Sequence, residues 1–250
     1  MRRARARVHN AGMADAPGPD PSPPAAGDPP TAGTLTDAQK ALRAQLLATE
    51  HWSLLASRST TQSEVLTRIA IFLTLVSAGL IGLGILGNAT QFRGWFGVAA
   101  LAVLFLLLVL GLITTIRAFN TATEDLMYVL AMNRLRAGYL DLDPGLAPYL
   151  MMSAHDDLKG SSVTYHAFFA RDVTQILGSS MMVITVVTAV VAGLFAGGVV
   201  TALELPVGVA VAAGVTVGAA ALVWMMLRGF RLYQRVWREH TPLRPTPADE

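Results

Sequence analysis

A group of polar residues near the middle of the chain has side chains suited to metal binding or acid–base chemistry: Ser153, His155, Asp156 and Asp157, with His166 further on. An imidazole and two carboxylates can ligate a divalent cation or move a proton. Their spacing matches no HExxH, P-loop or GxGxxG motif. Adjacent residues on a helix point about 100° apart, so Asp156 and Asp157 would not converge on one ion. We therefore expect Ser153 with Asp156 or Asp157 to cap a helix, and keep a metal site and a hydrolase as alternatives.

The rest of the chain offers little other chemistry. It contains no cysteine, which excludes disulfides, thiolate nucleophiles and cysteine-ligated metals. Its long apolar runs contain no ionisable side chain, whereas proton relays, voltage sensors and ion-coupled transporters place such groups there. Hydroxyl groups remain in these runs, and we expect most of them to bond back to their own helix. We predict no catalytic residue, no cofactor and no resident metal, and keep a hydroxyl-lined pore as an alternative.

The elements that must position these residues begin with four charge-free stretches of at least 23 residues: 69–92, 94–116, 173–203 and 205–227. About 20 apolar residues cross the hydrocarbon core of a bilayer. The sequence therefore predicts an all-α polytopic membrane protein, with four transmembrane helices in two hairpins plus cytoplasmic amphipathic helices. We place the hairpins at 67–117 and 173–227.

The basic residues predict an orientation. Of 19 Lys and Arg residues, Arg93 is the only one between two paired spans, and the others flank the opposite ends of the spans. The positive-inside rule then places both termini and the central loop in the cytoplasm. Arginine makes up 17 of these 19 residues, which together with abundant Ala, Gly and Val is typical of a GC-rich bacterial genome. We expect a multi-pass protein of the bacterial cytoplasmic membrane, whose pI of about 9.2 requires no nucleic acid to explain it.

Four segments lie outside the spans. Residues 1–33 are rich in Pro, Gly, Ala and Asp, and we expect a disordered tail. Residues 34–58 predict a cytoplasmic amphipathic helix with a weak break at 59–61, either packed on the central loop or lying in the membrane interface. Residues 118–172 predict a helical loop, which starts at a capping box (121–124) or continues the second span, breaks at 141–145 and leads helically into the third span from Ser161. Residues 228–250 predict a basic juxtamembrane helix that ends in a loose tail after Thr241.

Small residues recur at a spacing of four in the last two spans: Ala189, Gly193 and Gly197, then Ala210, Gly214 and Gly218. In lipid, such stripes allow two helix backbones to approach closely. We expect the two stripes to pair within one chain or, alternatively, to form an oligomer contact.

Four arginines follow the last span along one helix face: Arg228, Arg231, Arg235 and Arg238. Basic side chains just inside a membrane attract anionic lipid. We therefore expect this stripe to bind anionic inner-leaflet lipids, with a docking site for a cytoplasmic protein as the alternative.

The stretch EDLMYVLAMNRLRAGYLDLDPGLAPYLMMSAHDD resembles a segment of uncharacterised bacterial multi-span membrane proteins. In those, an Asn-Arg-aliphatic-Arg element precedes a Pro-containing turn, an aromatic residue and a His-Asp pair, here at 133–136, 144–149, His155 and Asp156. This resemblance implies no activity. A cytoplasmic helix before a tight hairpin is also similar to the architecture of small two-span effectors of bacterial conflict systems, which implies a pore-forming function.

Three functions therefore follow as hypotheses. The first is a non-enzymatic, self-associating membrane scaffold or interaction protein with a possible cytoplasmic partner. The second is a channel or pore-forming effector gated from the cytoplasmic side. The third is a membrane-bound hydrolase that uses His155, Asp156 and Asp157.

Overall fold

The computed structural model describes residues 35–168 and 179–248, and all regular elements in these ranges are helical. The elements are α1 (Asp37–Thr90), α2 (Phe96–Leu142), the 3-10 helix η1 (Pro144–Tyr149), α3 (Leu158–Tyr165), α5 (Ser180–Ala202) and α6 (Val207–Glu239). Four of them, α1, α2, α5 and α6, are long and apolar enough to cross a membrane. The predicted all-α architecture with four spans is confirmed, and we treat the chain as an integral membrane protein.

Two of the four helices are much longer than a bilayer is thick. At 1.5 Å per residue, α1 with 54 residues is about 81 Å long and α2 with 47 residues about 70 Å, whereas α5 with 23 residues is about 35 Å. The predicted amphipathic segment 34–58 is therefore the first part of α1 and continues into the span. We call the pair formed by residues 37–66 of α1 and 118–142 of α2 the stalk.

The weak break predicted at 59–61 is absent. No glycine or proline lies between Asp37 and Ala78, so nothing in the sequence forces the helix to end. The Thr60 hydroxyl donates to the Ala56 carbonyl oxygen at 3.0 Å, within its own helix. A hydroxyl that bonds to the preceding turn is compatible with a continuous helix, which is why this cluster does not act as a cap.

The second helix, α2, is likewise continuous through a predicted boundary. The capping box predicted at 121–124 does not start a new helix, because α2 runs unbroken through it. The helix ends at Leu142, where Asp143 and Pro144 open η1 as the breaker at 141–145 predicts. Beyond η1, α3 ends at Tyr165 and residues 166–168 are not helical. The helix expected from Ser161 is therefore present as far as Tyr165, but the prediction that it runs on continuously into the third span is wrong.

Some predictions fall on residues outside the described ranges. These are the disordered tail at 1–33 and the part of the helical lead into the third span that lies between 169 and 178. The third span itself begins at Ser180, where the Ser179 hydroxyl caps α5 by accepting from the Met182 amide at 3.2 Å. Its last residue is Ala202.

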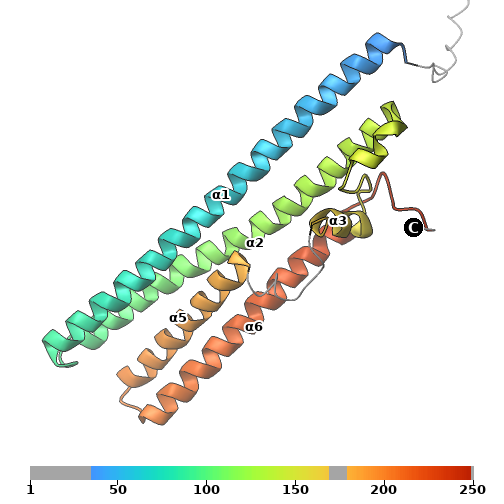
Figure 1. The fold of residues 1–250 in the computed structure, drawn as a ribbon. Helices are drawn as coiled ribbons and strands as arrows, with labels where there is room; N and C mark the ends of the chain where they lie inside the picture. Colours follow the sequence, from blue (N-terminus) through green and yellow to red (C-terminus); the bar gives the residue numbers. More distant parts are fainter. Residues whose placement is uncertain (1–34, 169–178, 249–250) are drawn as a thin grey trace, which may run out of the picture.

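The four long helices lie side by side in the order α1, α2, α5, α6, and the N-terminal end of α1 and the C-terminal end of α6 lie at the same end of the bundle (Figure 1). A cluster of apolar residues joins α1, α2 and α5 near one end of the spans: Val65, Ile69, Phe72, Ala118 and Ile184. Gly111 of α2 lies close to side chains of both neighbouring helices. A Cβ there would lie 2.8 Å from the Thr188 hydroxyl of α5 and 2.9 Å from the Phe72 ring of α1, so these side chains would have to shift to admit a larger residue.

The helices α5 and α6 meet through their small residues. A Cβ on Gly193 would lie 2.7 Å from the Gly214 carbonyl oxygen, and one on Gly214 would lie 2.9 Å from the Gly193 carbonyl oxygen. Gly197 and Gly218 approach Ala210 and Ala189 of the opposite stripe at 3.1 and 3.2 Å in the same way. Backbone therefore touches backbone along the hairpin, which is the geometry that small residues allow in lipid.

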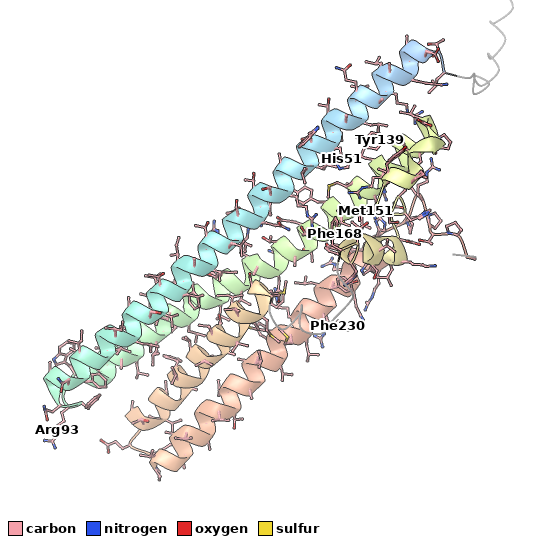
Figure 2. The ribbon with its side chains drawn as sticks, viewed as in Figure 1. His51, Arg93, Tyr139, Met151, Phe168 and Phe230 are labelled. Atoms are coloured by element: carbon pink, nitrogen blue, oxygen red, sulfur yellow. The ribbon has the colours of Figure 1, made fainter. Side chains whose placement is uncertain are left out.

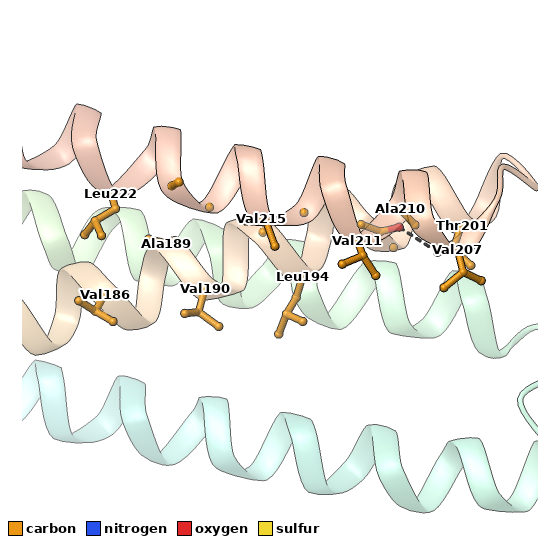
Figure 3. Close-up of a pocket in the computed structure, with 16 residues that line it drawn as sticks. Val186, Ala189, Val190, Leu194, Thr201, Val207, Ala210, Val211, Val215 and Leu222 are labelled. Carbon is orange, nitrogen blue, oxygen red and sulfur yellow. Dashed lines mark hydrogen bonds between the residues drawn. The ribbon is translucent and has the colours of Figure 1, made fainter.

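An apolar groove of about 660 Å³ follows this α5–α6 contact. The larger side chains on its rim, seen in Figure 3, are Val186, Val190, Leu194, Val211, Val215 and Leu222. The stripe residues carry at most one side-chain carbon, so they leave the space between these rims unfilled.

Candidate functional site

The polar residues singled out in the sequence meet outside the spans. They join the last turns of α2, the loop before α3 and the chain after α6, and we call this cluster the polar junction: Asn133, Arg134, Asp156 and Asp157, with the segment 240–246 that we call the tail. Figure 1 shows these parts together at the end of α2 and α6. The predicted Asn-Arg-x-Arg element and the His-Asp pair therefore lie next to each other in space.

Asp156 is the centre of the junction and is fully buried. Arg134 donates to one carboxylate oxygen, which also accepts from the Leu243 amide at 3.1 Å, and the other oxygen accepts from the Arg244 amide at 2.7 Å. Burial alone would raise the pKa of Asp156, but the donors outweigh it and hold this pKa below its ordinary value. Its carboxylate is therefore a charged anchor for the tail.

Asp157 has two tasks. One carboxylate oxygen accepts from the Gly160 amide at 2.7 Å and caps α3, as one of the predicted alternatives had it. The same carboxylate binds the Thr246 amide at 2.7 Å and the Thr246 hydroxyl at 2.9 Å. Burial would raise the pKa of Asp157, and these donors lower it below its ordinary value. The alternative that Asp156 caps the helix is wrong, and Ser153 instead accepts from the His155 amide at 3.0 Å in a turn.

The segment after Thr241 was expected to be a loose end, and this prediction is wrong for residues 242–246. Arg134 also donates to the Thr241 carbonyl oxygen at 3.2 Å, and the His240 ring nitrogen Nε2 lies 2.6 Å from the Asp156 carbonyl oxygen. The Asp156 amide donates to the Arg244 carbonyl oxygen at 3.1 Å, and Arg244 forms an ion pair with Asp141. These contacts hold the tail against the loop.

Asn133 ties the loop to both neighbouring helices. It is fully buried; its amide nitrogen donates to the His155 carbonyl oxygen at 2.7 Å, and its oxygen accepts from Arg136 at 2.6 Å and from Thr164 at 2.9 Å. Gly160 is required beside it, because a Cβ there would lie 2.2 Å from the His155 carbonyl oxygen. The loop is therefore fixed by α2 and α3 as well as by the tail.

This geometry describes a structural clamp. Every carboxylate oxygen of Asp156 and Asp157 accepts at least one hydrogen bond from the protein. Within 35–168 and 179–248, no group of three or more His, Asp or Glu side chains could hold a metal ion. The arrangement joins three segments of the chain. The carboxylates of Asp156 and Asp157 are used to form the hydrogen bonds between these segments.

A second polar cluster holds the stalk together at its middle. Asp125 of α2 accepts from Arg58 of α1 at 2.6 and 3.1 Å, from Gln62 at 2.7 Å and from the Tyr165 hydroxyl of α3 at 2.8 Å. Burial, and then Asp125, raises the pKa of Tyr165 well above its ordinary value. The sequence does not predict this cluster, because the partners of Asp125 lie 40 to 67 residues from it and share no motif with it.

Inside the spans, hydroxyl groups serve their own helices. Those of Thr74, Ser77, Thr114 and Thr185 each donate to the carbonyl oxygen four residues earlier, at 2.6 to 2.9 Å. This behaviour was expected for most of these groups and is confirmed for these four. Thr188 does the same and also lies 3.1 Å from the Thr115 hydroxyl of α2, which links α5 to α2.

The arginine stripe lies exposed on α6. Arg228 lies over the Trp224 ring at 5.8 Å, whereas Arg235 pairs with Glu239 at 2.8 Å within its helix. At 1.5 Å per residue, Arg228 lies about 2 Å and Arg238 about 17 Å beyond Leu227, the last residue of the charge-free run. Arg228 and Arg231 are therefore the two members closest to the depth of lipid headgroups.

Comparisons with known proteins add no family. No protein-family model, no curated protein and no solved structure matches this chain. The resemblance of the central stretch to bacterial multi-span proteins stays a prediction.

Proposed function

We propose that the protein is a non-enzymatic, self-associating membrane scaffold whose stalk presents a binding surface to a cytoplasmic protein. The observation that carries this proposal is a set of exposed apolar side chains on the stalk part of α1. Leu42, Leu46 and Trp52 are 59%, 63% and 71% exposed. Large apolar side chains that face water are typical of interaction sites, because leaving them uncovered is unfavourable.

The distance of these residues from the spans supports a protein partner over a lipid one. The first charge-free run begins at Ile69, so Trp52 lies about 25 Å and Leu42 about 40 Å from it along the helix axis. Interfacial aromatic anchors lie at the headgroup level, next to the end of a span. Because α1 is continuous with its span, the exposed residues project away from the bilayer.

The polar junction supports a non-enzymatic role. The residues that a hydrolase would need, Asp156 and Asp157, hold the tail and α3 in place. A carboxylate that anchors the fold by buried hydrogen bonds is poorly placed to exchange a proton with a substrate.

The arrangement of charge supports the proposed orientation. The described ends of the chain lie at the same end of the bundle, together with the stalk, the junction and the arginine stripe (Figure 1). We place this end in the bacterial cytoplasm, with Arg228 and Arg231 at the anionic lipid of the inner leaflet. No nucleic acid is needed to account for the basic residues.

Self-association is proposed at α6. This helix buries only Ala210 and Met225, and its main neighbour is α5. A second copy of the chain would cover the membrane face of α6 that α5 leaves open.

Site-specific photo-crosslinking tests the proposal in living cells. A photoreactive residue at Trp52 should give discrete adducts, because this side chain faces water at the proposed surface. The same residue at Glu50, an exposed polar position two residues away on another side of the helix, should give none. A crosslinker at Val215 of α6 should give a species of twice the mass of the chain. Equal adduct formation at positions 50 and 52 contradicts the binding surface, and absence of the doubled mass contradicts self-association at α6.

A further inference from the structure

A buried guanidinium lies behind the polar junction, and no carboxylate of the described residues forms an ion pair with it. Arg136 of α2 is 7% exposed, and its partners are the Asn133 side-chain oxygen at 2.6 Å and the Met152 sulfur at 3.0 Å. Among the ion pairs of residues 35–168 and 179–248, none includes Arg136. Its positive charge therefore has no counter-ion in the described structure.

Among the described residues, the strongest electrostatic influence on this guanidinium comes from another cation. Burial, and then the charge of Arg58, lowers the pKa of Arg136. His51 of α1 stacks on Tyr139 with ring centroids 6.0 Å apart, and burial followed by the charge of Arg136 lowers the pKa of His51 (Figure 2). A buried charge is costly unless an opposite charge or strong hydrogen bonds compensate it, so this position favours an anion.

Met152 is also one of the residues that line a hollow of about 440 Å³. The hollow is lined by the end of α2, the loop after η1, α3 and the tail, with Leu140, Leu150 and Val163 among its apolar residues and Lys159 and Thr246 among its polar ones. Sites for small molecules have this size and this combination of an apolar wall with a few polar groups. Met152 lines the hollow and its sulfur contacts Arg136, so we treat this residue as the partition between the two.

The contact between the Met152 sulfur and Arg136 is a weak one. A thioether sulfur is a poor hydrogen-bond acceptor, and a methionine side chain changes rotamer easily. A carboxylate or phosphate binds a guanidinium through two parallel hydrogen bonds, which are about twice as strong as neutral ones. An anion in the hollow would therefore gain more from Arg136 than the Met152 sulfur does.

We propose that this hollow binds a small anion with an apolar body, a carboxylate or a phosphate monoester, whose oxygens replace the Met152 sulfur on Arg136 and pair with Lys159. The apolar body would lie against Leu140, Leu150 and Val163. The bound anion would touch Thr246 and so stabilise the tail on the junction. This site is separate from the surface around Trp52, and neither proposal depends on the other.

The depth of the site favours a soluble anion over a lipid headgroup. Leu140 is 23 residues beyond Arg117, the first charged residue after the second span, which places it about 35 Å away along the axis of α2. A phospholipid headgroup lies at the end of the spans and would have to leave the bilayer to reach the hollow.

Calorimetric titration of the full chain in phosphatidylcholine nanodiscs tests this site, with phenyl phosphate as the probe. We expect saturable binding of phenyl phosphate and none of benzyl alcohol, which has the apolar body without the charge. The chain contains only two lysines, which gives a matched pair of variants. Lys159→Gln should weaken binding about tenfold, the effect expected for one charged contact of about 1.4 kcal/mol. Lys40→Gln should not change it, because Lys40 is exposed near the start of α1 and does not line the hollow.

Two further variants examine the partition. Met152→Ala removes the sulfur and should tighten binding of phenyl phosphate, while Arg136→Gln should abolish it. Because Arg136 is buried, the folding of its variant is checked by circular dichroism, and the Met152 and Lys159 variants decide the matter if it does not fold. No saturable binding to the wild type, or equal affinity in the two lysine variants, overturns the proposal.

A second titration, in nanodiscs that contain an anionic lipid, distinguishes a soluble anion from a lipid headgroup as the ligand. Phenyl phosphate should bind equally well when the nanodiscs contain phosphatidylglycerol. A loss of affinity in these nanodiscs that Lys159→Gln removes would show that a lipid headgroup competes for the site, and would overturn the assignment to a soluble anion.

Discussion

The two ends of this molecule hold their helices together by opposite means. Between α5 and α6, inside the spans, glycine backbones touch at distances that leave no room for a Cβ. In the stalk and junction, long polar side chains reach across the gaps: Arg58 to Asp125, and Arg134 to Asp156. In lipid there is little hydrophobic driving force between helices, so close backbone contact replaces it. In water, charge-assisted hydrogen bonds select one register among many similar ones.

The largest effect is expected when a backbone contact between α5 and α6 is blocked. Gly193→Leu places a side chain where the Gly214 carbonyl oxygen lies 2.7 Å away, and should destabilise the protein by more than about 4 kcal/mol. Thermal unfolding in nanodiscs measures this. Gly82→Leu is the matched control, because a Cβ on Gly82 meets nothing within 4 Å, and it should unfold like the wild type. Equal effects of the two substitutions would refute the backbone contact.

The polar counterpart of this test is Asp156→Asn. This change leaves Arg134 without its counter-ion and should cost about 3 kcal/mol, because the carboxylate is fully buried. Amide exchange at Leu243 and Arg244 should rise in the variant. Asp141→Asn removes a half-exposed ion pair with Arg244 and should cost below about 1 kcal/mol. If both variants release the tail equally, Asp156 is not its main anchor.

A smaller effect is expected from acid. The pKa values of Asp156 and Asp157 are both lowered from an ordinary value of 3.8, so their contribution to stability is complete above that pH. It is lost as pH falls through the lower values of the folded state. The protection of the amides of residues 243, 244 and 246 against exchange, relative to the intrinsic rate at each pH, should therefore fall below about pH 4, and Asp156→Asn should flatten this dependence. Protection that falls equally in the wild type and the variant would argue against these carboxylates as its cause.

The smallest effect concerns the stalk. Tyr165→Phe removes one hydrogen bond, to Asp125 at 2.8 Å, and should cost about 1 kcal/mol. Tyr149, which is 80% exposed, supplies the same chemical change at a water-facing position, and its Phe variant should be neutral. Chemical denaturation measures both, and equal stabilities would show that the Tyr165 bond contributes nothing.

The spans were predictable from sequence because lipid restricts what can cross it. Charge-free runs near 69–92 and 94–116 had to be helical, since backbone polar groups have no other partners in a bilayer. The small-residue stripes could also be seen at a fixed spacing of four. The break predicted at 59–61 is absent, because the Thr60 hydroxyl bonds to a carbonyl oxygen of its own helix and does not end it.

The polar contacts could not be predicted in the same way. Thr246 lies 89 residues after its partner Asp157, and the two belong to segments without periodicity. The same holds for Arg58 and Asp125, which are 67 residues apart. The sequence contained one indication of these contacts. The adjacent carboxylates at 156 and 157 would need hydrogen-bond donors if they were buried. Nothing in the residue order shows that the tail supplies them.

Because α1 is uninterrupted, a tilt of its membrane span displaces the far end of the stalk. No glycine or proline between Asp37 and Ala78 offers a hinge, so an angular change at the span passes undamped to the other end. A tilt of about 5° at Ile69 would move Leu42, about 40 Å away, by about 3 to 4 Å. Thickening or thinning of the bilayer changes the tilt of a span, and the stalk would convert it into a lateral displacement of this order.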